Sequence, residues 1–378
     1  MESNLALVVA LFVQLVVVGG LLLIQPFIVR RGLLFGVYVG EERWDGDEAR
    51  SITRRWTVAL AASMGLGLVL AALVVAIDGP VPLGVLVSVV TQIVASYGTY
   101  LWAHFRARRL AAPGAPAGAA ALVADKPGSL LLPLASLAIA GVGGAIALAY
   151  AWMHYAALPA QVPTHFGVSG RPDAWSPRSF GSVMMLPVAT LLMGLAMAVM
   201  AVLTARAKRA IRHPGSAASI DAQLRFRRAM ANFLAGVGIL TTTMLTLLSV
   251  YAVRTGLGLA PGLPGTFMAL VAAMLVYAVG GSLYLAFRYG QGGARLERKA
   301  GSGVLTNGLA DNSQWVLGVF YVNRDDPSIF VEKRFGLGYT INFGNPRAVA
   351  LFVALLVVIA GIVISGLTTP QTHLNPFE

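Results

Sequence analysis

The sequence predicts an all-α polytopic membrane protein with about eight transmembrane helices and a small cytoplasmic β-like segment between the last two spans. Hydrophobic residues make up 57% of the 378 residues and charged residues only 12%, about half the charged share of an ordinary soluble domain. Several uncharged runs reach the roughly 18 residues that a helix needs to cross a bilayer core. The basic residues also gather in alternate loops, as expected for a chain threaded through a membrane.

Each predicted span is a long apolar run bounded by charged or turn-forming residues. We expect spans at residues 4–29, 56–77, 81–103, 129–153, 181–204, 230–253, 265–287 and 347–368. The first run is long and no basic residue precedes it, so we expect an uncleaved span and not a signal peptide.

The distribution of Lys and Arg predicts the orientation of the chain. If the loop 30–55 is cytoplasmic, 25 of the 28 basic residues fall on the cytoplasmic side, in segments 30–55, 104–128, 205–229 and 288–347. The opposite side then keeps only Arg171, Arg178 and Arg254. By the positive-inside rule both termini face outside, and so does the loop 154–180.

The loops divide the chain into five parts. These are an N-terminal three-span unit 1–128 with the cytoplasmic loop 30–55, a two-span unit 129–204 around the outer loop 154–180, a two-span unit 205–288 that follows a basic loop, a cytoplasmic segment 289–346, and the last span with an outer tail, 347–378.

Three connecting segments carry further expectations. The Ala/Pro/Gly-rich stretch 111–128 is typical of a flexible linker. The basic stretch 205–230 is expected to be helical in its second half and to contact anionic lipid; no aromatic interleaving supports direct nucleic-acid binding. In the acidic loop 35–56 a short amphipathic helix should start near Asp47, with exposed ion pairs that contribute little energy.

Short alternating apolar and polar runs predict β-strands in the cytoplasmic segment. "WVLGVFYVNRDDPSIFVEKRFGLGYTINFG" (315–344) has such runs, separated by the turn-forming "NRDDP" and "GLG". Two or three strands alone are marginally stable in water, so this segment should pack against the cytoplasmic ends of the helices.

No residue pattern indicates catalysis, a metal site or a cofactor. Cysteine is absent, which excludes disulfides and thiol chemistry. No hydrolase, zinc-protease or nucleotide-binding motif is present. No ionisable residue lies at the middle of a predicted span, although such residues usually mark proton or ion pathways. The polar residues within spans are neutral, among them Gln92 and Thr241–Thr243, and interhelical hydrogen bonding is the simpler explanation for them. Glycines 141–144 are explained by close helix packing.

The loop "LPAQVPTHFGVSGRPDAW" (158–175) is the densest polar and turn-forming stretch of the chain. Prolines 159 and 163 prevent the preceding helix from continuing and favour an extended path. Gly170 is suited to a positive φ and Pro172 to a turn. His165 can pair with Asp173 across that turn.

Two interpretations of this loop remain open. It is either a rigid outer cap that ties two spans together or a recognition surface for an extracellular peptide or ligand. Phe166 and Trp175 are amphipathic anchors suited to the membrane–water boundary. The recognition candidates are Pro163, His165, Phe166, Gly170, Pro172, Asp173 and Trp175.

The same loop resembles a known domain. A Leu-Pro pair, Pro-x-His-Phe and Gly-x-Pro-Asp-x-Trp resemble the motif of DUF1648, a domain found in the SdpI-like immunity and signalling proteins of bacteria. Here the pattern is matched by Leu158-Pro159, Pro163, His165-Phe166, Gly170, Pro172-Asp173 and Trp175. The resemblance implies a multi-pass protein of the bacterial cytoplasmic membrane that protects against a secreted peptide toxin and can sequester a repressor. The chain lacks a clear second SdpI-type domain after this stretch.

The cytoplasmic segment is similar to a second domain, DUF5808, which often follows DUF1648. The shared positions are Trp315, Gly318, Tyr321, Asn323, Asp326-Pro327, Phe330, Lys333-Arg334, Gly338, Asn342-Phe343 and Asn345-Pro346. From these we select the partner-docking candidates Trp315, Tyr321, Asn323, Asp326, Lys333, Arg334, Asn342 and Asn345.

The expected function is a non-enzymatic sensor, immunity or signalling role. The outer loop would recognise a peptide or envelope cue, and the cytoplasmic segment would dock a regulator. The expected partners are therefore the lipid bilayer, an extracellular peptide and a cytoplasmic regulator. The alternative is a transporter or lipid-handling permease with a neutral polar pathway that reaches Gln92 or Thr241–Thr243.

Overall fold

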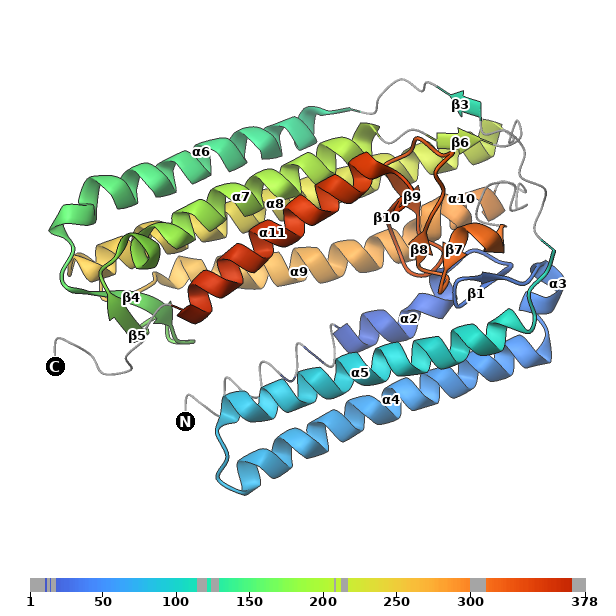
Figure 1. Ribbon diagram of the computed structural model, residues 1–378, viewed down its shortest axis with the longest axis horizontal. Helices are drawn as coiled ribbons and strands as arrows, with labels where there is room; N and C mark the ends of the chain where they lie inside the picture. The colour runs from blue at the N-terminus through green and yellow to red at the C-terminus, as the bar shows by residue number, and fades with distance from the viewer. Residues whose placement is uncertain are drawn as a thin grey trace. The chain divides into compact units, whose positions relative to one another are not determined.

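The computed structural model describes residues 11, 14, 18–113, 121–123, 129–206, 209–211, 217–299 and 311–368, and it is mainly helical (Figure 1). Its α-helices are α2 (Gly20–Ile28), α3 (Glu41–Trp44), α4 (Asp47–Ala76), α5 (Val81–Arg108), α6 (Leu131–His154), α7 (Phe180–Arg206), α8 (Ala217–Gly256), α9 (Gly265–Arg288), α10 (Ala294–Lys299) and α11 (Pro346–Thr368). Three short 3-10 helices are η2 (Tyr155–Ala157), η3 (Gln291–Gly293) and η5 (Asn312–Gln314).

Within the described residues, six helices are long and apolar enough to cross a membrane: α4, α5, α6, α7, α8 and α9. They coincide with the six internal spans predicted from the sequence. The two terminal spans are not among them. Much of the predicted span 4–29 falls outside the described residues, and α2 is the continuous helix within it. For the last predicted span, α11 contributes a shorter apolar stretch, Pro346–Gly361. Most of the predicted linker 111–128 also lies outside them.

The chain forms two compact units that do not follow its order in sequence. The first unit contains Met1–Asp125, Lys208–Phe226 and Leu283–Val349, and the second contains Lys126–Ala207, Arg227–Ser282 and Ala350–Glu378. The first unit therefore joins the N-terminal helices to the predicted cytoplasmic segment, which begins more than 160 residues further along the chain.

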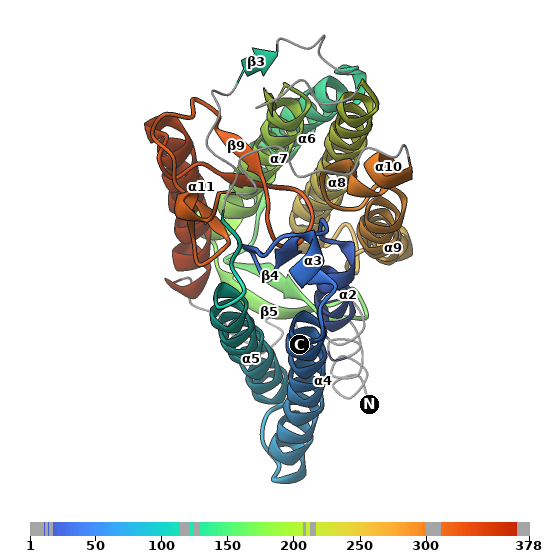
Figure 2. The ribbon, with the colours of Figure 1, turned by 90° about the vertical axis from the view of Figure 1, so that its right-hand side faces the viewer.

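A helical hairpin and four pairs of short strands make up most of the described part of the first unit. Helices α4 and α5 lie side by side in both views (Figures 1 and 2). α4 begins at Asp47, as predicted, where acidic side chains favour the positive end of the helix dipole. Its Ile52, Trp56 and Leu60 are buried against Tyr100 and Ala103 of α5.

The strands of the first unit form antiparallel pairs. β1 (Leu33–Leu34) pairs with β2 (Val37–Tyr38), β7 (Trp315–Val316) with β8 (Phe320–Tyr321), β9 (Phe330–Glu332) with β10 (Tyr339–Ile341), and β3 (Ala121–Val123) with β6 (Arg209–Ile211). The predicted strands of 315–344 are thus confirmed as two hairpins, and β1–β2 was not predicted.

Glycine brings the helices of the second unit into close contact. A Cβ at Gly194 of α7 would lie 2.6 Å from the Thr242 hydroxyl of α8 and 3.1 Å from the Ala140 Cβ of α6. A Cβ at Gly144 would meet Leu191 at 2.6 Å. Close packing therefore explains Gly143 and Gly144, as predicted, whereas a Cβ at Gly141 would meet nothing within 4 Å. Thr242 itself is buried between these helices. In the first unit the predicted polar residue Gln92 is also buried, and its side-chain amide donates to the Ser96 hydroxyl at 3.1 Å.

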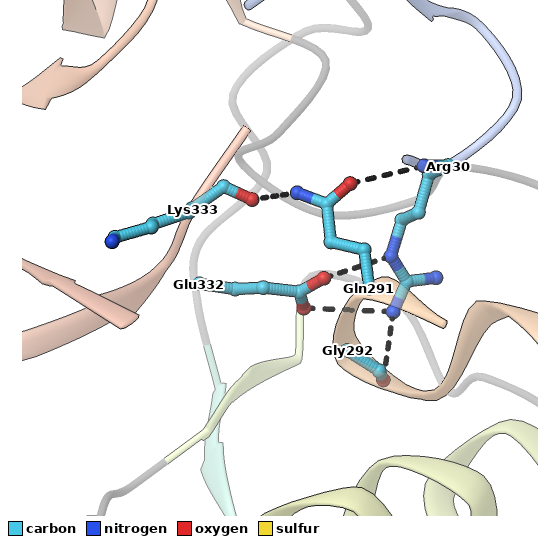
Figure 3. A network of polar contacts seen from close by, with 5 residues as sticks. All are labelled: Arg30, Gln291, Gly292, Glu332 and Lys333. Atoms are coloured by element: carbon cyan, nitrogen blue, oxygen red, sulfur yellow. Dashed lines mark hydrogen bonds and ion pairs between the residues drawn. The ribbon is translucent and has the colours of Figure 1, made fainter. Parts of the chain in front are cut away.

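A buried arginine joins three distant segments of the first unit (Figure 3). The Arg30 guanidinium, which follows α2, donates to both carboxylate oxygens of Glu332 on β9, at 3.0 and 3.5 Å, and to the carbonyl of Gly292 at 3.1 Å. The Arg30 backbone N–H donates to the side chain of Gln291 at 3.0 Å, and the Gln291 amide donates to the carbonyl of Lys333. The forked geometry makes this a strong, charge-assisted contact.

This pair predicts strongly non-additive mutational effects. Replacing either Arg30 or Glu332 by Met removes the charged partner of a side chain that is largely buried, at 7% and 16% side-chain exposure, and should cost about 3–5 kcal/mol. The double replacement should cost much less than the sum of the two single ones, because both charges of the pair are then removed together. Thermal unfolding in detergent measures all three variants.

The exposed pair Asp221–Arg225 on α8 is the matched control, since its side chains are 55% and 59% exposed. Its double-mutant cycle should show a coupling of no more than about 0.5 kcal/mol. Equal coupling energies for the two pairs would contradict the structural role given to Arg30.

Candidate functional site

The loop between α6 and α7 is a β-hairpin in the second unit (Figures 1 and 2). β4 (Gln161–Phe166) pairs with β5 (Pro172–Pro177), with bulges on either side of His165. The turn uses Gly170 at φ +77°, as predicted, and its amide donates to the carbonyl of Gly167. Two bulges in so short a ladder re-aim the side chain between them, and this side chain is His165.

His165 and Asp173 form the predicted pair across the hairpin. The His165 Nδ1 lies 2.5 Å from the Asp173 Oδ1, and both side chains are exposed, at 64% and 52%. The carboxylate accepts the Nδ1 proton and thereby fixes the ring orientation, which directs Nε2 away from Asp173. The arrangement presents an oriented imidazole with a carboxylate behind it on a rigid support.

Residues 174–176 of β5 are buried, in contrast to the exposed Asp173. The hydroxyls of Thr164 and Ser176 lie 3.0 Å apart, and Ser176 is fully buried. Trp175 is only 4% exposed, so it belongs to the core of this loop and is not the surface anchor that the sequence predicted. Trp175 follows Asp173 by two residues, so the period-two alternation of strands puts both on one face of β5, where Asp173 is exposed and Trp175 is covered. Phe166 is half-buried.

Further contacts fix the hairpin to its surroundings in the second unit. Arg178, just before α7, donates to the carbonyls of Ala156 and Leu158 at the end of η2. The carbonyl of Gly170 accepts the amide of Leu263 at 2.8 Å, in the connection between α8 and α9. The turn and both strand ends are therefore held in place.

A cavity of about 340 Å³ lies beneath this hairpin, within the size range of small-molecule sites. We call it the loop cavity. It is lined by Leu158, Val162–Phe166, Ser182, Val183, Met185–Pro187, Leu248, Ser249, Ala252, Val253, Leu263 and Phe267. The predicted candidates Pro163, His165 and Phe166 are thus brought together at one cavity, whereas Gly170, Pro172, Asp173 and Trp175 are not part of its wall.

A second apolar hollow lies between α6 and α8. It measures about 370 Å³ and is lined by residues such as Val142, Gly143, Thr242, Thr243 and Thr246. These threonines come from the polar run that the sequence singled out.

The β7–β8 hairpin of the predicted docking segment meets the β1–β2 hairpin of the same unit, turn against turn. In β1–β2 the turn residues Phe35 and Gly36 have φ of +44° and +78°, and in β7–β8 Leu317 and Gly318 have φ of +51° and +70°. A Cβ at Gly36 would lie 2.5 Å from the carbonyl oxygen of Gly318, so both glycines are required by this contact.

One helix holds both turns. The Tyr100 hydroxyl on α5 lies 3.0 Å from the carbonyl of Leu317 and 3.3 Å from that of Phe35, the equivalent positions of the two hairpins. The His104 Nδ1 donates to the same Phe35 carbonyl at 2.9 Å. These bonds support two bulky residues in the left-handed region, where such residues are strained.

Arg334 fills the space beside the turns. It is 1% exposed, donates to the Gly36 carbonyl at 3.1 Å and to the Asn312 side chain at 2.8 Å, and lies over the ring of Trp315. Burial lowers the pKa of Arg334, and the nearby Asp311 opposes that shift. Burial also lowers the pKa of Lys333.

The predicted docking residues mostly serve the interior of this segment. Asn342 uses its whole amide: it donates to the carbonyls of Asn323 and Asp326 and accepts from the amides of Asn323 and Gly344, all within 3.1 Å. The Asn345 side chain accepts from the Arg347 amide, capping α11. Trp315, Tyr321, Arg334, Asn342 and Asn345 are buried, and Asn323, Asp326 and Lys333 are partly exposed.

The sequence interpretation did not identify Phe35, Tyr100 or Arg30. An available signal was the repeat of "LLFGVYV" (33–39) in "WVLGVFYV" (315–322), where a Gly follows a bulky residue between strand-forming residues. Tyr100 and Arg30 carry no local signal, because their partners lie between 65 and 302 positions away in the sequence.

Two family models match the chain, in the predicted order. Residues 142–191 match the domain of unknown function DUF1648, and residues 324–349 match the family of unknown function DUF5808. Both resemblances found in the sequence are thereby confirmed. No curated protein and no solved structure matches the chain.

The matched segments correspond to the structures described above. The DUF1648 match covers most of α6, the β4–β5 hairpin and the first half of α7, which includes a large part of the loop cavity. The DUF5808 match begins after β8 and ends in α11, so it contains Arg334 and Asn342 but neither of the paired turns.

The Tyr100 contact predicts a loss of stability without any change in shape. Tyr100→Phe leaves the ring packing intact and removes the hydrogen-bond donor to the two strained carbonyls, which should cost about 1–3 kcal/mol. The control is Tyr97→Phe on the same helix, whose side chain is 69% exposed. Thermal unfolding in detergent should separate the two variants, and equal transition temperatures would refute the role of Tyr100.

Proposed function

We propose that this chain is a non-enzymatic receptor of the bacterial cytoplasmic membrane with a sensor or immunity role. Its loop 154–180 recognises an extracellular peptide or another envelope cue. The observation that carries the proposal is the loop cavity, with the oriented His165–Asp173 pair on the hairpin that covers it. A cavity with a few fixed polar groups on a rigid support is the usual form of a binding site.

The proposed arrangement has eight spans with both termini outside. It is supported by the 25 of 28 basic residues that fall on one side under this alternation. The loop cavity then faces the exterior, and the paired hairpins of the first unit face the cytoplasm.

The cytoplasmic half of the proposal is docking of a soluble regulator by the segment 312–346. Support comes from the outer face of β7–β8, where Val316 and Phe320 are 53% and 45% exposed although both are large and apolar. The predicted docking residues are mostly buried beneath Val316 and Phe320. The buried docking residues would therefore shape this face, and only the exposed side chains of the face would touch the regulator.

A lipid-handling permease is the second candidate, and the hollow beside Thr242 and Thr243 favours it. Reconstitution in vesicles with a fluorescent lipid distinguishes the two roles, because a receptor does not accelerate movement of the lipid between leaflets.

The orientation predicts which positions react with an impermeant thiol reagent. The chain contains no cysteine, so single cysteines report without interference. In intact cells Val168→Cys, in the hairpin turn, should be labelled, and Asp325→Cys, after β8, should be labelled only after the membrane is permeabilised. The reverse pattern would overturn the proposed topology.

The recognition role predicts a phenotype for the hairpin pair. Cells that lack the protein should become more sensitive to at least one member of a panel of secreted peptide toxins, and His165→Ala or Asp173→Asn should fail to restore protection. Asp47→Asn is the matched control, because this carboxylate is fully exposed in the first unit. Unchanged sensitivity across the panel, with the protein present at normal levels, would refute the proposal.

A further inference from the structure

The wall of the loop cavity offers almost no free hydrogen-bonding capacity. The Ser249 hydroxyl donates to the Leu245 carbonyl at 2.8 Å and lies 3.2 Å from the Thr190 hydroxyl. The Ser182 hydroxyl donates to the carbonyl of Pro177. The Thr164 hydroxyl is paired with Ser176. Each hydroxyl of the lining is therefore used within the protein, and the part of a ligand that enters must gain its free energy by burying apolar surface.

The cavity also has a direction. Its wall on α7 runs from Ser182 to Pro187 and on α8 from Leu248 to Val253, roughly 8 Å along each helix axis. Both stretches belong to helices that are long enough to cross a membrane. At the other end His165 combines a place in the lining with 64% exposure, so it marks the mouth.

We infer that the loop cavity binds a single aliphatic acyl chain, inserted between α7 and α8, with the polar end of the same molecule beside the His165 Nε2. The inference deepens the proposed function by naming the chemistry of the cue: an amphiphile with a hydrocarbon chain. The chain packs along Leu186 and Leu248 of the cavity wall. With Nδ1–H given to Asp173, the Nε2 of the neutral imidazole accepts from an amide N–H, a hydroxyl or a protonated carboxyl group at the mouth, and the protonated ring donates from Nε2 to a carboxylate or ester.

Such an acyl chain has two possible sources, a free amphiphile such as a fatty acid or a phospholipid of the surrounding bilayer. The first probe is spin-labelled stearic acid, and the second is spin-labelled phosphatidylcholine, each added to the full-length protein in nanodiscs. The electron paramagnetic resonance spectrum should contain an immobilised component with at least one probe. Binding of the fatty acid alone assigns a free amphiphile, and binding of the phospholipid alone assigns a bilayer lipid.

The decisive variant fills the cavity. Ala252→Phe places a ring where the chain lies and should weaken binding of the probe roughly tenfold or more, since several buried methylene groups lose their place. Ala145→Phe is the matched control, because this alanine is exposed on α6 and does not line the cavity. His165→Ala should weaken binding of the fatty acid but leave the chain immobilised at saturation.

A second measurement does not depend on how Ala252→Phe folds. Unlabelled fatty acids of increasing chain length compete with the probe on the wild-type protein. Their affinity should rise with each added methylene and then level off when the 340 Å³ cavity is full. Partition into bulk lipid gives no such plateau.

The inference is overturned if neither probe is immobilised, if Ala252→Phe and Ala145→Phe bind the probe equally, or if affinity rises with chain length without a plateau. The proposed function can fail separately. If the protein binds the acyl chain and its His165→Ala variant still protects cells fully, the acyl-chain site stands and its role in recognition is rejected. If His165→Ala abolishes protection but neither probe binds, the recognition role stands and the acyl-chain site is rejected.

Discussion

Buried non-helical backbone must satisfy its hydrogen bonds within the protein, and this constraint governs both β-containing parts of the structure. The strands are too short to do so through their own ladders, several of them having only two residues. Side chains complete the hydrogen bonding instead. In the first unit the Asn342 amide closes the chain around Asn323, and the Tyr100 hydroxyl reaches both tight turns. In the second unit Arg178 donates hydrogen bonds to the backbone carbonyls of Ala156 and Leu158, just after α6 ends. Polar residues that look like recognition groups in the sequence are therefore consumed in holding the backbone.

The same requirement explains why the first unit is discontinuous in sequence. Phe35 and Leu317 are held in a left-handed conformation that bulky residues avoid, so neither turn is expected to be stable as an isolated hairpin. Each is stabilised by the other through Gly36 and Gly318 and by α5 through Tyr100. Phe335 adds packing against Phe35, Tyr100 and Trp56. The C-terminal segment thus completes a core that the N-terminal helices begin, and Arg30 with Glu332 closes it at another point.

Composition was sufficient to predict the helices, because a span requires only length and apolarity. The six internal spans, the start of α4 at Asp47 and the His165–Asp173 pair all depend on neighbouring residues, and the sequence indicated each of them. The roles of Trp175 and Arg334 depend on which parts of their segments are covered, and distant segments decide that. An Arg is ordinarily exposed, and Trp175 was expected at the membrane–water boundary, yet here they are 1% and 4% exposed. The loop cavity could not be predicted either, since it arises where β4, α7 and α8 fail to fill the space between them.

Selectivity at the loop cavity is expected to come from the hairpin and not from the helices. The helical wall supplies Leu186, Leu248 and Val253, and an apolar wall distinguishes hydrocarbon chains only by length and shape, with small differences in free energy. The hairpin adds the one polar group with a defined direction, the imidazole of His165, whose orientation is fixed by Asp173 at 2.5 Å. Because the Gly170 turn is anchored to Leu263 and the strand ends are anchored by Arg178, that direction is set before any ligand arrives, and little conformational entropy is lost on binding. A group at the mouth that can pair with the imidazole is then favoured over one that leaves it unpaired, which is the kind of discrimination that an apolar cavity alone cannot provide.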